Sequence, residues 1–330
     1  MSLITLNKSN FFYNLDLILS KTGAVEKIAL VLKDNAYGHG IREIAQMAKE
    51  YGITKAVVRS DVEARQIEEF FEYILVLADI PKVPSNKIRY TINDMSRVQE
   101  YPKETLVELK VNTSMNRNGI NSDELNTTLK VIKKQGLKLE AVFTHHSCAD
   151  ELNANYDRQV KNFEAVKKSL SSKFRLHSCN SAALFRSPDF NEDMVRVGIA
   201  AYGCLEMPKS LSQVAFKPVL SLYADKISQR ELAKGDSVGY GASFVADEAT
   251  VVSNYDFGYG DGFLRACSDT YQTPNATKIA GRISMDNSSF LSDEKRLLIF
   301  EDAREVSKYA KTISYEVLTS LKENIKRQII

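Results

Sequence analysis

The sequence predicts a (β/α)8 barrel of the TIM type, followed by a mainly β C-terminal domain. From Lys27 to residue 206, short apolar or β-branched runs alternate with longer helical patterns, which implies parallel strands joined by helical crossovers. After Glu206 the long helical patterns disappear until the C-terminus, and glycine turns separate short apolar runs. A chain of 330 residues has room for a barrel and a smaller domain. We therefore expect the barrel at residues 7–206 and the β domain at residues 207–330, joined by residues 1–6.

The barrel prediction depends on the number of strand-like runs. Eight βα units favour a closed barrel over an open, doubly wound sheet. The predicted strands are Lys27–Leu32, Ala56–Val58, Tyr73–Ala78, Arg89–Ile92, Thr105–Val111, Leu139–Thr144, Phe174–His177 and Met194–Ala200. The predicted helices include Asp61–Phe71, Asp94–Tyr101, Asp123–Lys134 and Glu151–Ser169, with N-caps expected at Asp61, Asp94 and Ser122.

The second domain is predicted from a different pattern. Its expected strands are Val219–Ile227, Thr250–Asn254, Lys278–Ile283 and Arg296–Phe300. The final segment, Tyr315–Arg327, has a helical pattern, and Leu3–Leu6 is a candidate strand of the same domain.

Composition excludes several classes of function. Apolar residues make up 44% and charged residues 26%, as in ordinary soluble globular proteins. The net charge is +2, without a basic block, so a nucleic acid partner is not expected. No apolar run approaches the roughly 20 residues that span a bilayer, and no signal peptide is recognised. The cysteines Cys148, Cys179, Cys204 and Cys267 and the histidines His39, His145, His146 and His177 have no metal-ligand spacing. We expect a cytoplasmic protein without a metal, a nucleic acid or a membrane partner.

The segment Lys33–Gly40, KDNAYGHG, connects the first predicted strand to an amphipathic helix over residues 41–51. A lone lysine here would usually be an exposed loop residue. However, barrel enzymes carry their sites at the C-terminal ends of the strands, and other chemically capable residues share this position. They are Lys110 and Arg117 at the fifth strand, His145 at the sixth, Asn180 and Ser181 at the seventh, and Arg196 and Gly198 at the eighth.

These residues are suited to a phosphorylated cofactor. Loops after the last two strands often bind phosphate in such barrels, and Ser181 lies at an expected helix start where free N–H groups favour an anion. Gly198 would let backbone N–H groups approach closely. A lysine, a phosphate site and an arginine on one rim suggest an aldehyde cofactor held as a Schiff base, and pyridoxal 5'-phosphate (PLP) fits this description.

Arg196 and Tyr240 indicate which reaction the cofactor would support. An arginine can only donate hydrogen bonds, so a ring nitrogen that it faces stays unprotonated and the ring is a weaker electron sink. That favours prompt reprotonation, as racemisation requires. Lys33 can serve one face of the α-carbon, and Tyr240, within Val238–Phe244, is our candidate for the other, supported by His145 and Arg196.

Several segments resemble the alanine racemase family over nearly the whole chain. Lys33–Gly40 is similar to the family's PLP-lysine motif, K-x-N-A-Y-G-H-G. The other similar segments are Arg196–Gly203, Val238–Phe244, Gly258–Gly262, Gly281–Asp286 and Thr312–Glu316. The resemblance implies a PLP-dependent racemase that interconverts L- and D-alanine, supplies D-alanine for peptidoglycan, and forms a head-to-tail homodimer.

The resemblance also implies roles for individual residues. Lys33 would be the PLP lysine and one base, and Tyr240 the other base. Arg196 would face the ring nitrogen beside His145, and Lys110 matches a position that is carbamylated in some members. The implied phosphate contacts are Tyr37, Ser181, Gly198, Ile199 and Tyr315, and Asn180 beside Ser181 is a further candidate cofactor contact. Arg117 and Met285 would hold the substrate carboxylate, Tyr259 would narrow the entrance, and Tyr240 and Met285 would come from the partner subunit.

Some residues depart from the family pattern, and other functions remain open. Asn112 and Ser114 stand where the family has an acid and a glycine, and His146 is an additional histidine without an assigned role. Alternatives are a broad-specificity racemase, a basic-amino-acid decarboxylase, a PLP-binding homeostasis protein or a structural barrel. Arg196 argues against the decarboxylase, which would place an acid at the ring nitrogen. The β domain and Tyr240 argue against the homeostasis protein.

Overall fold

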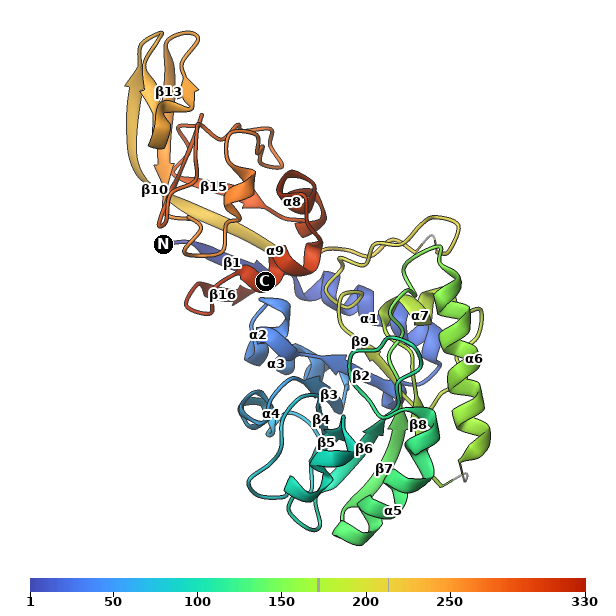
Figure 1. Cartoon of the computed structure of the whole chain (residues 1–330). Coiled ribbons are helices and arrows are strands. Elements are labelled where there is room, and N and C mark those ends of the chain that lie inside the picture. Colours follow the sequence, from blue (N-terminus) through green and yellow to red (C-terminus); the bar gives the residue numbers. More distant parts are fainter. Residues whose placement is uncertain (171–172, 213) are drawn as a thin grey trace.

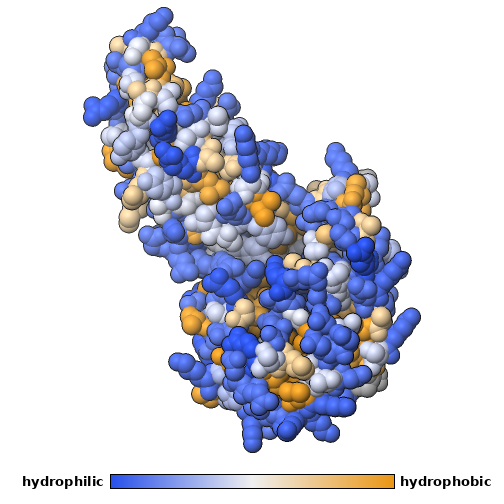
Figure 2. All heavy atoms as spheres, viewed as in Figure 1, coloured by the Kyte–Doolittle hydropathy of each residue, from blue (hydrophilic) through white to orange (hydrophobic). Residues whose placement is uncertain are grey.

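The computed structural model describes residues 1–170, 173–212 and 214–330. Figure 1 shows two bodies, a barrel and an elongated β domain, with both chain termini in the β domain. Figure 2 shows that polar residues cover most of the same face, with apolar residues in small separate groups. The predicted fold class is confirmed.

Eight parallel strands build the barrel. They are β2 (Ile28–Val31), β3 (Lys55–Val58), β4 (Tyr73–Val76), β5 (Ile88–Ile92), β6 (Leu106–Lys110), β7 (Lys138–Phe143), β8 (Arg175–His177) and β9 (Val195–Val197). Their order is β8-β7-β6-β5-β4-β3-β2-β9. An isolated bridge between Asn180 and Arg196 closes the ring between β8 and β9. All residues of β2, β4 and β9 are buried, as expected for parallel strands covered on both faces.

The helices around the barrel differ from the prediction by a few residues at one or both ends. They are α1 (Lys8–Thr22), α3 (Ile41–Tyr51), α4 (Asp61–Ile67), α5 (Leu125–Gln135), α6 (Ala154–Ser169) and α7 (Ser181–Arg186). Helix α4 begins at Asp61 as predicted but ends before Phe71. The predicted cap Asp61 is wrong, because Ser60 caps α4 in a capping box with Glu63. Ser122 is also wrong, because Asn121 precedes a 3-10 turn over Ser122–Glu124. Asp94 is confirmed as a cap, but its helix, Met95–Glu100, is a 3-10 helix.

The β domain is built on one long strand, β10 (Leu220–Leu232). The other strands of its sheet are β1 (Leu3–Leu6), β13 (Thr250–Tyr255), β14 (Ser288–Phe290), β15 (Arg296–Phe300) and β16 (Lys326–Ile329). The order is β14-β13-β10-β1-β16, and β15 also pairs with β10. β1 runs antiparallel to β10 and parallel to β16, so both ends of the chain lie in this sheet. The short strands β11 (Ser237–Val238) and β12 (Phe244–Val245) form a separate hairpin, and helix α8 (Ala303–Ala310) follows β15.

Two predictions for this domain are wrong. The segment Lys278–Ile283 forms only isolated bridges, from Lys278 to Gln272 and from Ile279 to Phe290, and Gly281 with φ 82° interrupts it. The segment Tyr315–Arg327 is not one helix. Helix α9 (Ser314–Ser320) ends early and the chain then enters β16. Pairing with β1 overrides the local helical pattern, as tertiary contacts commonly do.

The β domain holds the segment that follows Lys33. Arg327, in β16, donates hydrogen bonds to the Gly38 carbonyl over 3.2 Å from Nε and 2.9 Å from Nη2. Gly38 has φ 74°, and a side chain at this position would overlap the backbone of Leu318 in α9. The position after the first barrel strand is therefore fixed from the other domain.

Candidate active site

Lys33 begins a left-handed turn within the segment that connects the first barrel strand to the next helix. The turn is α2 (Lys33–Tyr37), in which the φ angles of residues 34–37 lie between 51° and 54°. This conformation is unfavourable for residues other than glycine, so the surroundings must impose it. Glu63 accepts a hydrogen bond from the Asp34 N–H over 2.6 Å, and the Asn35 side chain accepts one from the Ile41 N–H over 2.8 Å.

The amine of Lys33 is accessible and weakly paired. Its side chain is 36% exposed, and its Nζ lies 3.8 Å from Asp34 Oδ2 and 5.9 Å from the centre of the Tyr37 ring. Asp34 makes a closer ion pair with Arg59, at 3.0 Å. Lys33 is therefore free to react with a ligand at this rim.

The expected phosphate contacts lie together. Ser181 Oγ accepts hydrogen bonds from the N–H groups of Gly198, over 3.1 Å, and Ala200, over 3.4 Å. The Tyr37 ring lies 5.7 Å from that of Tyr315, centre to centre. Burial raises the pKa of both phenols, so their hydroxyls stay protonated and can donate to an anion.

The remaining two expected cofactor contacts, Asn180 and Ile199, are next in sequence to Ser181 and Gly198. Asn180 caps α7, since its Oδ1 accepts a hydrogen bond from the Ala183 N–H over 2.9 Å. Ile199 is buried, directly after Gly198. The structure thus brings Tyr37, Asn180, Ser181, Gly198, Ile199 and Tyr315 into one neighbourhood.

Arg196 is buried, and both of its terminal nitrogens, Nη1 and Nη2, are hydrogen bonded within the barrel. Its Nη1 donates to His177 Nδ1 and to the His177 carbonyl, the latter over 3.4 Å. Its Nη2 donates to the carbonyls of Thr144, over 2.7 Å, and Ser178, over 3.0 Å. Among the described residues no acceptor meets Nε. Since a guanidinium has five N–H groups, the Nε–H is the one available to a ligand.

Positive charges gather around Arg196. Burial, with help from Arg117, Arg196 and Lys33, lowers the pKa of Lys110 to about 8. Burial and the charges of Arg196, Lys110 and Arg117 hold the pKa of His145 well below its usual value. No ion pair involves Lys110 within the described ranges of the chain. This positive rim suits an anionic ligand.

Three predicted site residues lie elsewhere on the chain. In the β domain Tyr240 is 70%, Met285 56% and Tyr259 40% exposed. Tyr259 and Met285 are neighbours, because the Tyr259 N–H donates to the Ser284 carbonyl over 3.0 Å and the Gly260 N–H to that of Met285 over 2.7 Å. No hydrogen bond of the described residues joins the Tyr240 side chain to the barrel. Among the described residues, the contacts of Lys33 Nζ are with Asp34 and the Tyr37 ring and do not include Tyr240.

The comparisons with known proteins decide the family. Residues 6–206 match the model for the N-terminal domain of alanine racemase, and residues 219–329 match the model for its C-terminal domain. The chain belongs to the alanine racemase family. It is thus an amino-acid racemase, an isomerase.

Relatives cover the chain completely. An alanine racemase of Campylobacter curvus is 42% identical over 340 residues, covering 100% of both chains. A crystal structure of alanine racemase from E. faecalis superposes with a TM-score of 0.90 at 25% identity, covering 100% of this chain and 98% of the other. A histidine racemase from Leuconostoc mesenteroides shares the fold, with a TM-score of 0.86 at 22% identity and coverage of 100% and 98%.

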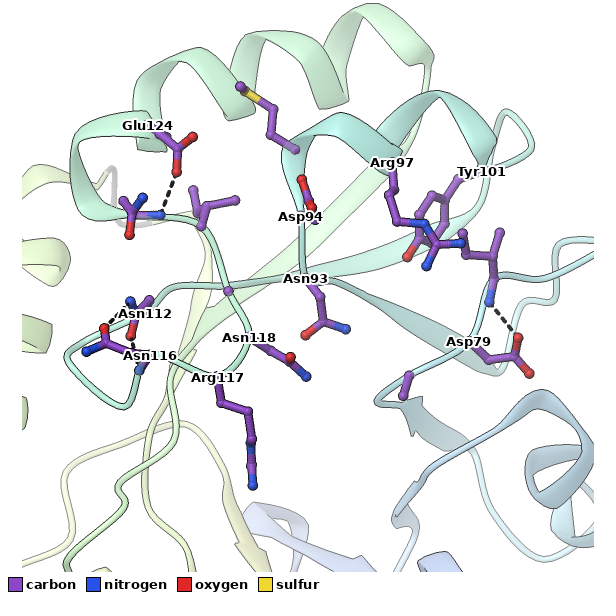
Figure 3. Close-up of a pocket in the computed structure, with 16 residues that line it drawn as sticks. Asp79, Asn93, Asp94, Arg97, Tyr101, Asn112, Asn116, Arg117, Asn118 and Glu124 are labelled. Carbon is purple, nitrogen blue, oxygen red and sulfur yellow. Dashed lines mark hydrogen bonds between the residues drawn. The ribbon is translucent and has the colours of Figure 1, made fainter.

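The segment around Arg117 shows how this racemase accommodates its departures from the family pattern. A cavity of about 680 Å³ lies at the ends of β4, β5 and β6, and Arg117 projects beside Asn93 and Asn118 (Figure 3). Asn112 Oδ1 accepts hydrogen bonds from the N–H groups of Ser114, over 3.1 Å, and Asn116, over 3.0 Å. Ser114, at the family's glycine position, has φ 95°. The loop keeps a glycine-like backbone, stabilised by the Asn112 amide.

Two buried residues that connect to Arg196, His177 and Glu108, were not predicted from the sequence. His177 Nε2 lies 2.8 Å from Glu108 Oε2, and both side chains are at most 1% exposed. The available signal was Glu108 itself. It stands two positions before Lys110 in a strand whose other residues are mostly apolar, and a carboxylate is rarely buried without a partner.

His146 contacts Ser178, whose carbonyl accepts a hydrogen bond from Arg196. Its Nε2 lies 3.0 Å from Ser178 Oγ, its Nδ1 meets no partner among the described residues, and burial lowers its pKa to about 4.

Within residues 1–170, 173–212 and 214–330, no three His, Cys, Asp or Glu side chains are grouped to hold a metal ion. In the same residues, every helix is too short or too polar to cross a membrane.

Proposed function

We propose that this racemase interconverts L-alanine and D-alanine with PLP as its cofactor, and supplies D-alanine for peptidoglycan in the cytoplasm. The observation that carries the proposal is Arg196, whose guanidinium is fixed by four hydrogen bonds while its Nε–H meets no acceptor among the described residues. Curated relatives named alanine racemase support the choice of substrate. Four cysteines without disulfide bonds agree with a reducing compartment.

The residues present fit PLP. Lys33 offers an accessible amine. The Tyr37 hydroxyl lies beside Gly198, whose N–H donates to Ser181 Oγ, and the Tyr315 ring lies beside that of Tyr37, so a phosphate would be held here. When bound, PLP withdraws electrons from the amino acid and so acidifies its α-hydrogen. Arg196 Nε–H can only donate, so a PLP ring nitrogen held against it would carry no proton.

Lys33 moves the proton on one face of the α-carbon in this proposal. Arg117 and Met285 hold the substrate carboxylate, and the positive rim around Lys110 and His145 favours binding of that anion. If Lys110 is carbamylated, the carbamate orients Arg117. The amine of Lys110 titrates near pH 8, so part of it is uncharged and able to react with carbon dioxide.

Tyr240 moves the proton on the opposite face, and it comes from a second copy of the chain. Its 70% exposure, together with the exposed Met285 and Tyr259 of the same domain, supports a head-to-tail homodimer in which these side chains complete the partner's site. A phenol that must exchange protons near neutral pH needs positive neighbours. The rim around Arg196 and Lys110 supplies them. Tyr259 narrows the entrance.

A broad-specificity amino-acid racemase is the remaining alternative, since the fold is shared with a histidine racemase. The test is a substrate panel. Purified protein loaded with PLP is incubated with single enantiomers of alanine, serine, lysine and histidine, and optical purity is followed by chiral chromatography. Racemisation of alanine well ahead of the others is expected, and comparable rates on all four would favour the alternative. The Lys33→Ala variant should lose both the absorption band of bound PLP and all turnover.

A further inference from the structure

A line of charged and polar side chains runs through the interior of the barrel. It starts at Arg196 on β9, continues through His177 on β8 and Glu108 on β6, and ends at Arg175 on β8. His177 and Glu108 have exposed fractions of 1% and 0%, whereas Arg175 is 33% exposed. Burying a carboxylate is costly unless it is fully paired. Its presence in a barrel core therefore needs an explanation beyond packing.

The hydrogen bonds determine where His177 carries its proton. Arg196 Nη1 can only donate, so His177 Nδ1 must accept and cannot be protonated. The single proton of the imidazole then lies on Nε2, which donates to Glu108 Oε2 over 2.8 Å. Burial lowers the pKa of His177, in agreement with a neutral ring.

Glu108 is itself held in one orientation. Its Oε1 accepts hydrogen bonds from the Tyr73 hydroxyl and, over 3.2 Å, from Arg175 Nη2, while Oε2 faces His177. Burial alone would raise the pKa of Glu108, but the hydrogen bonds from His177 and Tyr73 and the charge of Arg175 hold it below its usual value. Glu108 is thus an oriented anion aimed at His177 Nε2.

We propose that Glu108 is a positioning residue, which fixes the His177 proton on Nε2 and so keeps Nδ1 as the acceptor that orients Arg196. If the proton moved to Nδ1, the His177 ring would present an N–H to an arginine N–H, and Arg196 would lose one of its four anchors. Its Nε would then no longer be directed at the cofactor ring. This assignment rests on the proposed function only for its consequence in catalysis, since the proton position can be measured in the protein alone.

The test is ¹⁵N NMR of the histidine side chains, with and without PLP. The chain has only four histidines, and a His177→Asn variant identifies the His177 signals. We expect the wild-type protein to show a neutral His177 ring protonated on Nε2 from pH 6 to about pH 8. A wild-type ring protonated on Nδ1, or on both nitrogens, would overturn the proposal without any Glu108 variant having to fold.

The Glu108→Gln variant tests the link to Arg196. An amide can donate as well as accept, so it no longer selects one tautomer. We expect signals of both tautomers, a shifted absorption band of bound PLP, and a kcat lowered about 10-fold to 100-fold with little change in KM, by analogy with the loss of a hydrogen bond behind a metal-binding histidine. Unchanged tautomer, band and kcat would contradict the proposal.

Glu192→Gln is the matched control. Glu192 is also a mostly buried carboxylate, with 9% of its side chain exposed. It accepts from the Ser178 hydroxyl, the backbone N–H groups of Ser178 and Cys179 and Lys167 Nζ, not from the His177 ring. It should lose stability without changing the His177 tautomer. If the wild-type tautomer is as expected but the loaded protein does not racemise any amino acid, the proposed function fails and the assignment of the His177 proton stands.

Discussion

The hydroxyl of Tyr37 occupies the space that a side chain at position 198 would need. A Cβ added to Gly198 would lie 3.0 Å from Tyr37 Oη and 3.1 Å from its Cζ, closer than nearly all natural contacts. The first and last strands of the barrel are adjacent. The contact between Tyr37 and Gly198 therefore joins the turn after Lys33 to the loop after the last strand, whose N–H groups donate hydrogen bonds to Ser181 Oγ. A side chain at position 198 would therefore require the Tyr37 ring to shift by a few tenths of an ångström.

Gly198→Ala should therefore weaken PLP binding. The added methyl group must displace Tyr37 or the backbone beside Ser181, and we expect the dissociation constant of PLP to rise about tenfold, equivalent to about 1.4 kcal/mol. Titration of the apoprotein followed by absorbance measures this change. The double variant Gly198→Ala with Tyr37→Phe should show less than the sum of the two single effects, since one collision partner is shortened. Strict additivity would show that the two residues do not compete for space.

Ser114→Gly should stabilise the protein. Ser114 has φ 95°, which costs a non-glycine residue about 1–3 kcal/mol, while glycine loses roughly 0.5–1 kcal/mol through its more flexible unfolded chain. We expect a net gain of about 1 kcal/mol, seen as a higher Tm in thermal melts. Ser114→Ala is the control, because it keeps the strain and removes only the hydroxyl. A Ser114→Gly protein that melts no higher than the Ser114→Ala protein would contradict this explanation.

Lys110 should make the folded protein more stable as the pH rises. Its pKa is about 8 when folded, against 10.5 in the unfolded chain, so between these values the unfolded state binds more protons and the free energy of unfolding increases with pH. The gain is at most about 3 kcal/mol. It should be absent in Lys110→Met, as measured by denaturant melts in buffers free of carbon dioxide.

A carbamate on Lys110 would remove this titration. Adding ¹³C-bicarbonate should then give a carbamate signal in ¹³C NMR that is missing from Lys110→Met, and should flatten the pH dependence of stability. No signal at any pH, with the titration unchanged, would show that the amine remains free.

If each active site combines Lys33 of one subunit with Tyr240 of the other, two inactive variants should restore activity when they are co-expressed. Lys33→Ala and Tyr240→Phe are each expected to be inactive or severely impaired alone. Co-expressed, they form hybrid dimers in which one site has both changes and the other has neither, so activity should return to about a quarter of the wild-type value at statistical mixing. If Tyr240 served Lys33 of its own chain, every site in the mixture would be damaged and activity would not return.

Much of the fold and the rim could be predicted from the sequence, because alternation along the chain determines both. Strict βα alternation placed Lys33, Lys110 and Arg196 at the same ends of parallel strands, and these positions are confirmed. The failures have a common cause. The left-handed turn after Lys33 and the strand over Lys326–Ile329 are imposed by contacts from distant segments, such as Glu63 and β1.

The interior network could not be predicted for the same reason. Glu108 and His177 are 69 positions apart and meet only because β6 and β8 face the same barrel interior. No local pattern relates them. The meeting of Lys33 with Tyr240 is also beyond one chain's sequence pattern, and it stays a prediction, as do the catalytic roles of both residues and the domain boundary at residue 206.

The α-hydrogen exchange of L-alanine and D-alanine in D₂O, followed by NMR with the PLP-loaded protein, tests most directly whether Lys33 and Tyr240 act on opposite faces of the substrate. The wild-type enzyme should exchange the α-hydrogen of both enantiomers. Tyr240→Phe should lose exchange from one enantiomer by about 100-fold or more, the usual contribution of a positioned acid or base, while Lys33 continues to exchange the other. Equal loss from both enantiomers would contradict the assignment of Lys33 and Tyr240 to opposite faces.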